Sequence, residues 1–163
     1  MSDKPEIRFY HLERSALEQA LVQLAPKIYG MGHRIVVQCA SVERLKALDT
    51  HLWSYRKDSF IPHGSAADGN AEEQPIWLTV EPETPNGADI LILCEGSERA
   101  EMGEFKIVCD LFDGVDPDAL SAARNRWKQR KDEGYPLTYW QQSPRGAWEK
   151  KATANMPRDE VDA

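Results

Sequence analysis

The sequence lacks the motifs by which α/β proteins commonly bind phosphate. Neither GxxxxGK[ST] nor GxGxxG occurs in its 163 residues, so no glycine-rich loop presents backbone amides to a phosphate. The turn after the first predicted strand, HLERSA, contains no glycine, which prevents close approach to a pyrophosphate. The glycines of GMGHR, 30–34, follow a predicted helix instead of opening one. We therefore expect no nucleotide cofactor.

Motifs for metal binding and nucleophilic catalysis are also missing. The four histidines form neither HExxH nor another close ligand pair, so no metal site is expected. GxSxG, the nucleophile turn of many hydrolases, is absent. Asp89, Cys109 and Asp110 lie near predicted strand ends, where α/β enzymes often hold catalytic groups. We favour turn and strand-end roles for them, and keep a small enzyme acting on a nucleotide or phosphate as the alternative.

Long apolar runs are missing as well. No run approaches the roughly 20 residues of a membrane helix, and the N-terminal MSDKPEIRFY has no apolar signal segment. The three cysteines are odd in number and widely separated, which favours buried, reduced thiols over a disulfide. These features predict a cytoplasmic protein without a membrane partner.

Positive charge is scarce except in one place. The chain has 20 Lys+Arg against 27 Asp+Glu and a net charge of −7, which disfavours a broad surface for duplex DNA. Residues 124–131, RNRWKQRK, hold five positive charges and no acid. A local basic segment on an acidic chain predicts contact with a small acidic or phosphate-bearing partner.

The hydrophobic pattern predicts an α/β fold. The expected order is β-α-β-α-loop-β-β-β-α, and its early alternation is typical of βαβ units. The length favours a single domain, with a three-layer, mostly parallel sheet like that of nucleotide-binding folds. The links 81–88 and 95–104 are short for helical crossovers, which leaves antiparallel pairing open for some later strands.

The domain is expected to span residues 1–148. Within it, 64–75 (GSAADGNAEEQP) has the composition of a flexible loop. LTYW, 137–140, is expected to form a short strand or an extended segment. The tail 149–163 has no apolar period and is expected to be disordered.

The segment 116–133 is expected to form the last helix. Asp116 is placed to cap it, Pro117 to occupy its first position, and Gly134 to end it. At about 100° per residue, its apolar side and one cationic edge come together. The apolar side consists of Leu120, Ala123 and Trp127, and the edge beside Trp127 consists of Arg124, Lys128 and Lys131. Arg126 and Arg130 fall on the far flank. A solvated helix face explains the cations equally well. The functional alternatives are a pocket for an apolar group with nearby acids, or a site for single-stranded nucleic acid.

A second unusual segment is HLWSYRKDSFIPHG, 51–64. Trp53 completes a predicted helix, while Phe60, Ile61 and Pro62 lie in a predicted loop. Apolar groups exposed on a soluble chain commonly mark an interface, so we expect these three to contact another protein.

The sequence resembles the chi subunit family of bacterial DNA polymerase III. The resemblance runs from residue 7 to about 148 and rests on LDTHLW, SFIPHG, IWL, DILIL, ARNRWKQRK and the terminal GAW. LW-x₆-FIPH is its most specific part. It implies a single α/β domain without a phosphate loop. It also implies a non-catalytic accessory subunit that is associated with the clamp loader of the replicase.

The resemblance also implies two binding sites. One is the basic helix, which would hold the acidic, phenylalanine-ending C-terminal tail of single-stranded DNA-binding protein (SSB). Its residues would be Arg124, Trp127, Lys128 and Lys131, with Trp148 as a further wall. The family usually has tyrosine where Trp127 stands. The other would bind the psi subunit, or a helicase instead, through Trp53, Phe60, Ile61, Pro62 and His63. DNA would then be reached through SSB.

Overall fold

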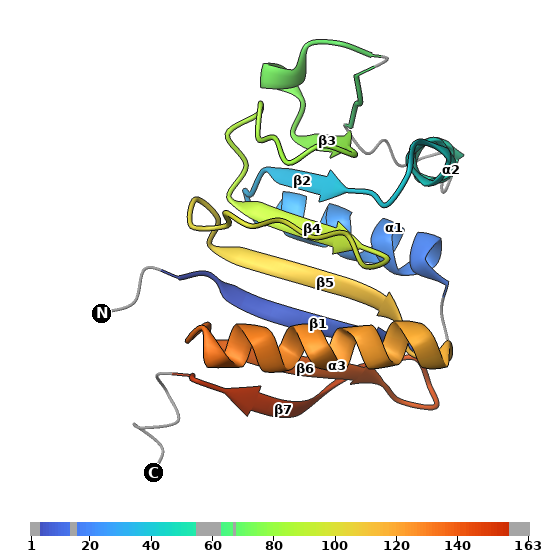
Figure 1. Ribbon diagram of the computed structural model, residues 1–163. Helices are drawn as coiled ribbons and strands as arrows, with labels where there is room; N and C mark the ends of the chain where they lie inside the picture. The colour runs from blue at the N-terminus through green and yellow to red at the C-terminus, as the bar shows by residue number, and fades with distance from the viewer. Residues whose placement is uncertain (1–3, 14–15, 55–62, 67, 157–163) are drawn as a thin grey trace.

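The computed structural model describes residues 4–13, 16–54, 63–66 and 68–156 (Figure 1). One seven-stranded sheet has the order β3-β2-β4-β5-β1-β6-β7. The elements are β1 Glu6–Leu12, α1 Leu17–Gly30, β2 Ile35–Gln38, α2 Val42–Ser54, the 3₁₀ turn η1 Ala71–Glu73, β3 Ile76–Thr79, β4 Ile90–Cys94, β5 Ile107–Asp113, α3 Pro117–Asp132, β6 Leu137–Gln142 and β7 Trp148–Ala154.

The sheet separates two apolar layers. Helices α1 and α2 cover one face, and α3 lies across the other face over β1 and β6 (Figure 1). Strand β4, ILILC, is buried along its whole length, as a strand covered on both faces must be. The predicted three-layer α/β fold is confirmed. Among the described residues, no helix is both long and apolar enough to span a membrane.

The structure decides the pairing that the sequence left open for the later strands. β3 and β4 both pair with β2 in parallel, and β4 also pairs with β5 in parallel. The antiparallel pairing left open for some later strands therefore does not apply to β3 and β4, and among the described strands only β6 and β7 pair in this way. A parallel crossover needs a dozen or so residues but no helix, and the 95–106 link crosses in irregular form. It buries Met102 and Phe105 on the α3 face.

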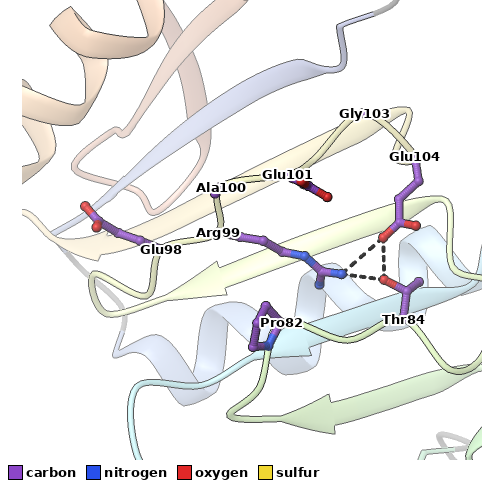
Figure 2. Close-up of a pocket in the computed structure, with 8 residues that line it drawn as sticks. All are labelled: Pro82, Thr84, Glu98, Arg99, Ala100, Glu101, Gly103 and Glu104. Carbon is purple, nitrogen blue, oxygen red and sulfur yellow. Dashed lines mark hydrogen bonds and ion pairs between the residues drawn. The ribbon is translucent and has the colours of Figure 1, made fainter.

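Arg99 joins this link to the preceding one. Its side chain is only 5% exposed. The guanidinium donates to the Glu83 carbonyl oxygen at 3.1 Å, Thr84 Oγ1 at 2.5 Å and Glu104 Oε1 at 3.1 Å. In Figure 2 the Arg99 guanidinium points toward the Thr84 and Glu104 side chains. All three residues line a cavity of about 910 Å³. One buried cation thus fastens two links that contain no helix.

The C-terminal segment differs from the expectation. Residues 148–154 form β7, which pairs antiparallel with β6. The disorder predicted for 149–163 is therefore wrong over Glu149–Ala154, while 157–163 lie outside the described residues. Trp148 and Ala154 turn into the two apolar layers at either end of the strand, and this burial stabilises a strand that is otherwise exposed.

The three cysteines are free and buried, as the sequence predicts. Burial raises the pKa of Cys39 and of Cys109 to about 12. Since the thiolate is the reactive form, these side chains act as small apolar groups of the core.

Candidate functional site

Helix α3 carries the candidate site, and local sequence fixes its position. The Asp116 side chain accepts a hydrogen bond from the Asp118 backbone N–H at 3.0 Å, and Pro117 occupies the first turn. Gly134 follows the helix with a φ of +88°, a conformation that glycine adopts without strain. Ala123 is completely buried, and Leu120 and Trp127 pack beside it. The predicted caps and apolar side are confirmed.

Trp127 lies at the centre of an aromatic cluster. Its ring meets Phe9 of β1 edge to face with centroids 5.4 Å apart, and Tyr139 of β6 at 5.7 Å. The side chain is only half-buried, so part of the ring stays accessible. Edge-to-face pairs of this kind add to the energy of burial. Trp127 therefore stabilises the packing of α3 and also offers an apolar surface.

Two of the five cations stabilise the fold. The Arg126 guanidinium donates to both Asp110 carboxylate oxygens, at 2.8 and 3.0 Å, and the two side chains are 12% and 5% exposed. Burial raises the pKa of Asp110, while the neighbouring Arg126 opposes this rise. Arg130 binds Glu133 Oε1 at 3.1 Å and the Arg99 carbonyl oxygen at 3.3 Å. This flank of α3 faces β5 and the 95–106 link, and we call it the paired flank.

The other three cations form the opposite flank. Arg124, Lys128 and Lys131 are all exposed, and the structure shows no ion pair for them within the parts of the chain it describes. Because the paired flank faces β5, this flank faces β6 and β7. Burial raises the pKa of Tyr139 of β6, and the positive charge of Arg124 opposes that rise. We call Arg124, Lys128 and Lys131 the open flank.

Trp148 lies on the other face of the sheet. Its ring meets Tyr10 edge to face with centroids 5.0 Å apart, within the layer covered by α1 and α2. Trp127 belongs to the layer beneath α3. The two tryptophans therefore cannot line one pocket, and the prediction of Trp148 as a wall of the site is wrong. Tyr139 of β6 lies beside Trp127 instead. The sequence did not single out this residue, and the alternation within LTYW was the only signal for it.

The 51–64 segment is described only in part. Trp53 falls in the last turn of α2, and Phe60, Ile61 and Pro62 lie outside the described residues. The His63 side chain is fully buried, with Nε2 3.0 Å from Asp49 Oδ1 of α2. Because the His63 ring is fully buried, it cannot contact a partner directly in the present conformation. His63 instead ties the start of the 63–66 segment to α2.

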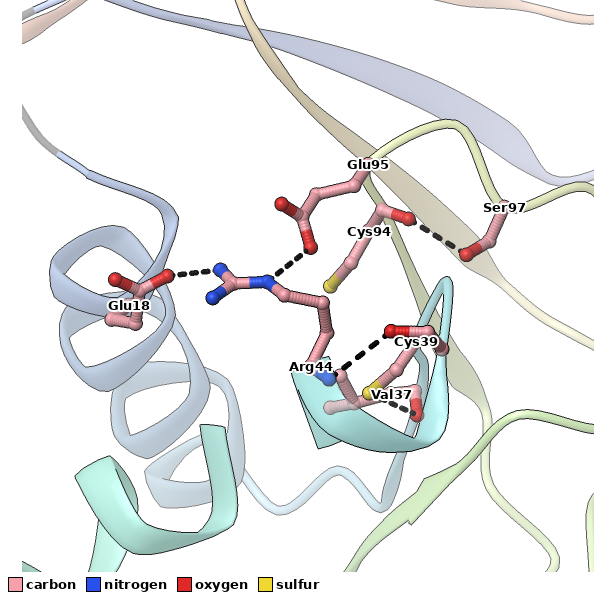
Figure 3. A network of polar contacts seen from close by, with 8 residues as sticks. Glu18, Val37, Cys39, Arg44, Cys94, Glu95 and Ser97 are labelled. Atoms are coloured by element: carbon pink, nitrogen blue, oxygen red, sulfur yellow. Dashed lines mark hydrogen bonds and ion pairs between the residues drawn. The ribbon is translucent and has the colours of Figure 1, made fainter. Parts of the chain in front are cut away.

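The crevice that holds phosphate in nucleotide-binding folds is occupied by side chains. Figure 3 shows Arg44 of α2 between Glu18 of α1 and Glu95, which follows β4. Arg44 binds a Glu18 carboxylate oxygen, and its Nε donates to Glu95 Oε1 at 2.8 Å. Asp113 lines the same cavity of about 190 Å³. Three carboxylates against one arginine disfavour an anion there.

The residues kept for an enzymatic alternative do not converge. Asp89 precedes β4 at the amino edge of the sheet and lies 2.5 Å from His33 Nδ1. Asp110 is paired with Arg126 on the α3 face. Cys109 belongs to the core layer of the opposite face. A nucleophile and its base must lie within hydrogen-bonding reach, so this arrangement disfavours catalysis by these three.

Comparison with known proteins decides the family. The sequence model of the protein family named DNA polymerase III chi subunit, HolC, matches residues 5–138 of this chain. This chain belongs to that family. As a chi subunit it is an accessory component of DNA polymerase III and functions in DNA replication. The matched range includes all of α3 and ends within β6, so β7 lies beyond it.

Chi subunits of several bacteria are similar over most of their length. The chi subunit of Pseudomonas aeruginosa is 32% identical over 123 residues, which cover 76% of this chain and 84% of the relative. The probable chi subunit of Rickettsia prowazekii is 26% identical over 157 residues, which cover 90% and 92%. The chi subunit of Escherichia coli is 27% identical over 124 residues, which cover 76% and 84%.

Proposed function

We propose that this chi subunit links DNA polymerase III to SSB by binding the acidic, phenylalanine-ending C-terminal tail of SSB at the open flank of α3. The chain would be a non-catalytic adaptor associated with the clamp loader, and it would reach DNA through SSB. The observation that supports this proposal is the open flank itself. Three exposed cations border the accessible part of an aromatic ring.

The chemistry of the flank matches such a tail. The terminal phenylalanine would pack against Trp127 and Tyr139, whose rings are 5.7 Å apart. Arg124 and Lys128 would bind the terminal carboxylate and the acidic side chains, because charge-assisted hydrogen bonds are the stronger kind. Arg126 and Arg130 already have acidic partners in the fold. The open flank is therefore where a tail can gain ion pairs without breaking any.

The test is a titration with an acidic peptide that ends in phenylalanine. We expect Arg124→Ala and Lys128→Ala each to weaken binding about tenfold, since each removes a charged hydrogen-bond donor. Added salt should weaken wild-type binding as well. Lys46→Ala is the matched control, because Lys46 is an exposed cation on α2, on the other face of the sheet.

The adaptor proposal fails if Arg124→Ala and Lys128→Ala bind the peptide as tightly as Lys46→Ala does. It also fails if the isolated chain binds single-stranded DNA tightly without SSB, because direct DNA binding would then explain the cations. Binding by fluorescence anisotropy measures both ligands under the same conditions.

We further propose that the 51–64 segment contacts a second replisome protein, either psi or a helicase. Its support is the apolar run at Phe60, Ile61 and Pro62 next to a segment that His63 ties to α2. Phe60→Ala should reduce capture of that protein from a lysate by about tenfold, as loss of a buried aromatic anchor does. Equal capture of the same protein by Phe60→Ala and Lys46→Ala would remove this proposal.

A further inference from the structure

Strand β7 leaves one edge of the sheet open. It is the last strand in the sheet and pairs only with β6 among the described strands. Its residues 149–153 are exposed. An edge strand presents unpaired N–H and C=O groups that can pair with another extended chain. The edge therefore has the backbone groups that a further strand requires.

The register shows which backbone groups face outward. The Ile7 N–H donates to the Pro136 carbonyl oxygen at 2.9 Å, so alternate residues of β6 from Pro136 onward face β1. At the other end of the hairpin, the Ser143 N–H donates to the Ala147 carbonyl oxygen at 2.7 Å. Both bonds place the pair Trp140 and Lys150 where the two strands do not exchange hydrogen bonds. The Lys150 N–H and C=O consequently point away from β6.

The charge around this edge selects an acidic chain. Lys150 and Lys151 lie on β7 itself, and Arg145 lies in the hairpin turn. The Lys150 ammonium lies over the Trp140 ring, 5.8 Å from its centroid, on the sheet face covered by α1 and α2. Glu149 offsets part of this charge through its ion pair with Lys151 at 3.2 Å. Lysines and an irregular register on an edge strand normally prevent pairing with other chains. For an acidic chain the same lysines are attractive.

A direct tie holds β7 next to the basic helix. The Asn155 side-chain amide, one residue after β7, donates to the Lys131 carbonyl oxygen at 2.9 Å and to the Tyr135 carbonyl oxygen at 3.1 Å. The C-terminal end of β7 therefore lies next to the C-terminal end of α3. A chain bound at Trp127 can continue along β7.

We propose that the acidic residues preceding the terminal phenylalanine of the bound tail pair with β7 as an eighth strand. This inference rests on the proposed function, because it takes the same tail as its ligand. The phenylalanine and terminal carboxylate occupy the open flank. The preceding backbone hydrogen-bonds along the edge at Lys150, and its acidic side chains meet Lys150 and Lys151. Strand β7 thereby lengthens the site beyond α3.

The experiment compares Lys150→Pro with Lys150→Ala. Both remove the charge, but only proline removes the outward N–H, and an edge strand tolerates proline where that group faces solvent. The probes are an acidic peptide of about eight residues ending in phenylalanine, long enough to form a strand, and its last three residues alone. We expect Lys150→Pro to bind the long peptide about fivefold more weakly than Lys150→Ala, as loss of a backbone hydrogen bond predicts. The short peptide should not distinguish them.

The outcomes separate the two proposals. If neither peptide binds wild type, or if Arg124→Ala binds both normally, the tail-binding function itself fails. If wild type binds both peptides but Lys150→Pro and Lys150→Ala bind the long one equally, only the pairing with β7 fails. Should Lys150→Pro not fold, amide exchange decides: the wild-type Lys150 N–H must exchange more slowly with the long peptide bound. Unchanged exchange at saturation overturns the pairing.

Discussion

Replacing Asp110 with alanine should lower the free energy of unfolding by about 3–5 kcal/mol, the usual effect of removing one partner from a buried ion pair. Arg126 would keep its charge in a place where its side chain is only 12% exposed. Its two hydrogen bonds to the carboxylate would be lost together. Urea unfolding followed by circular dichroism measures the change.

The double variant Asp110→Leu with Arg126→Met is the matched control. It removes both charges and keeps apolar volume, so its unfolding free energy should lie within about 2 kcal/mol of wild type. A loss in the double variant as large as in Asp110→Ala would show that the ion pair itself, and not the unpaired charge, carries the stability. Turnover of a nucleotide or phosphate substrate that disappears in Asp110→Asn would revive the enzymatic alternative.

Replacing Trp127 with alanine should lower the free energy of unfolding by about 3 kcal/mol, the lower end for an aromatic residue because Trp127 is half-buried. The variant loses the edge-to-face contacts with Phe9 and Tyr139. Helix α3 is then held to the sheet mainly by Leu120, Ala123 and the paired flank. Thermal unfolding should show a clearly lower Tm.

Trp127→Tyr is the control for this substitution. A tyrosine ring can retain contact with both neighbours, so its Tm should fall much less than that of Trp127→Ala. If both variants unfold at the wild-type Tm, the ring does not stabilise the helix. Because Trp127→Ala changes folding as well as the proposed site, tail binding is better tested with Arg124 and Lys128, which are exposed.

The pattern of α3 could be predicted because it depends on a single period. A 3.6-residue turn places Leu120, Ala123 and Trp127 on one side, and they do pack on the sheet. The same period separates Arg126 and Arg130 from the other three cations. Which flank would be paired could not be predicted, because Asp110 lies on β5 and meets Arg126 only once strand and helix are packed together.

The wrong predictions, for residues 149–154 and for Trp148, concern a segment whose neighbours in the fold are distant in sequence. WEKKATA has no apolar alternation because β7 is an edge strand, and only its two ends are buried or half-buried. A register irregularity between Tyr139 and Trp140 further obscures its period. Trp148 faces Tyr10 because of that pairing, and no pattern within GAW shows to which side of the sheet the ring turns.

The position of β1 has a consequence for synthesis of the chain. β1 is translated before the other strands of the sheet but lies in its interior, with Tyr10 opposite Leu111 on one side and Trp140 on the other. The two strands that pair with β1, β5 and β6, therefore leave the ribosome much later than β1 does. Long-range strand pairing of this kind slows folding and exposes unpaired edges in the interval. For most of its translation, this chain therefore contains an interior strand of the sheet without the two strands that pair with it.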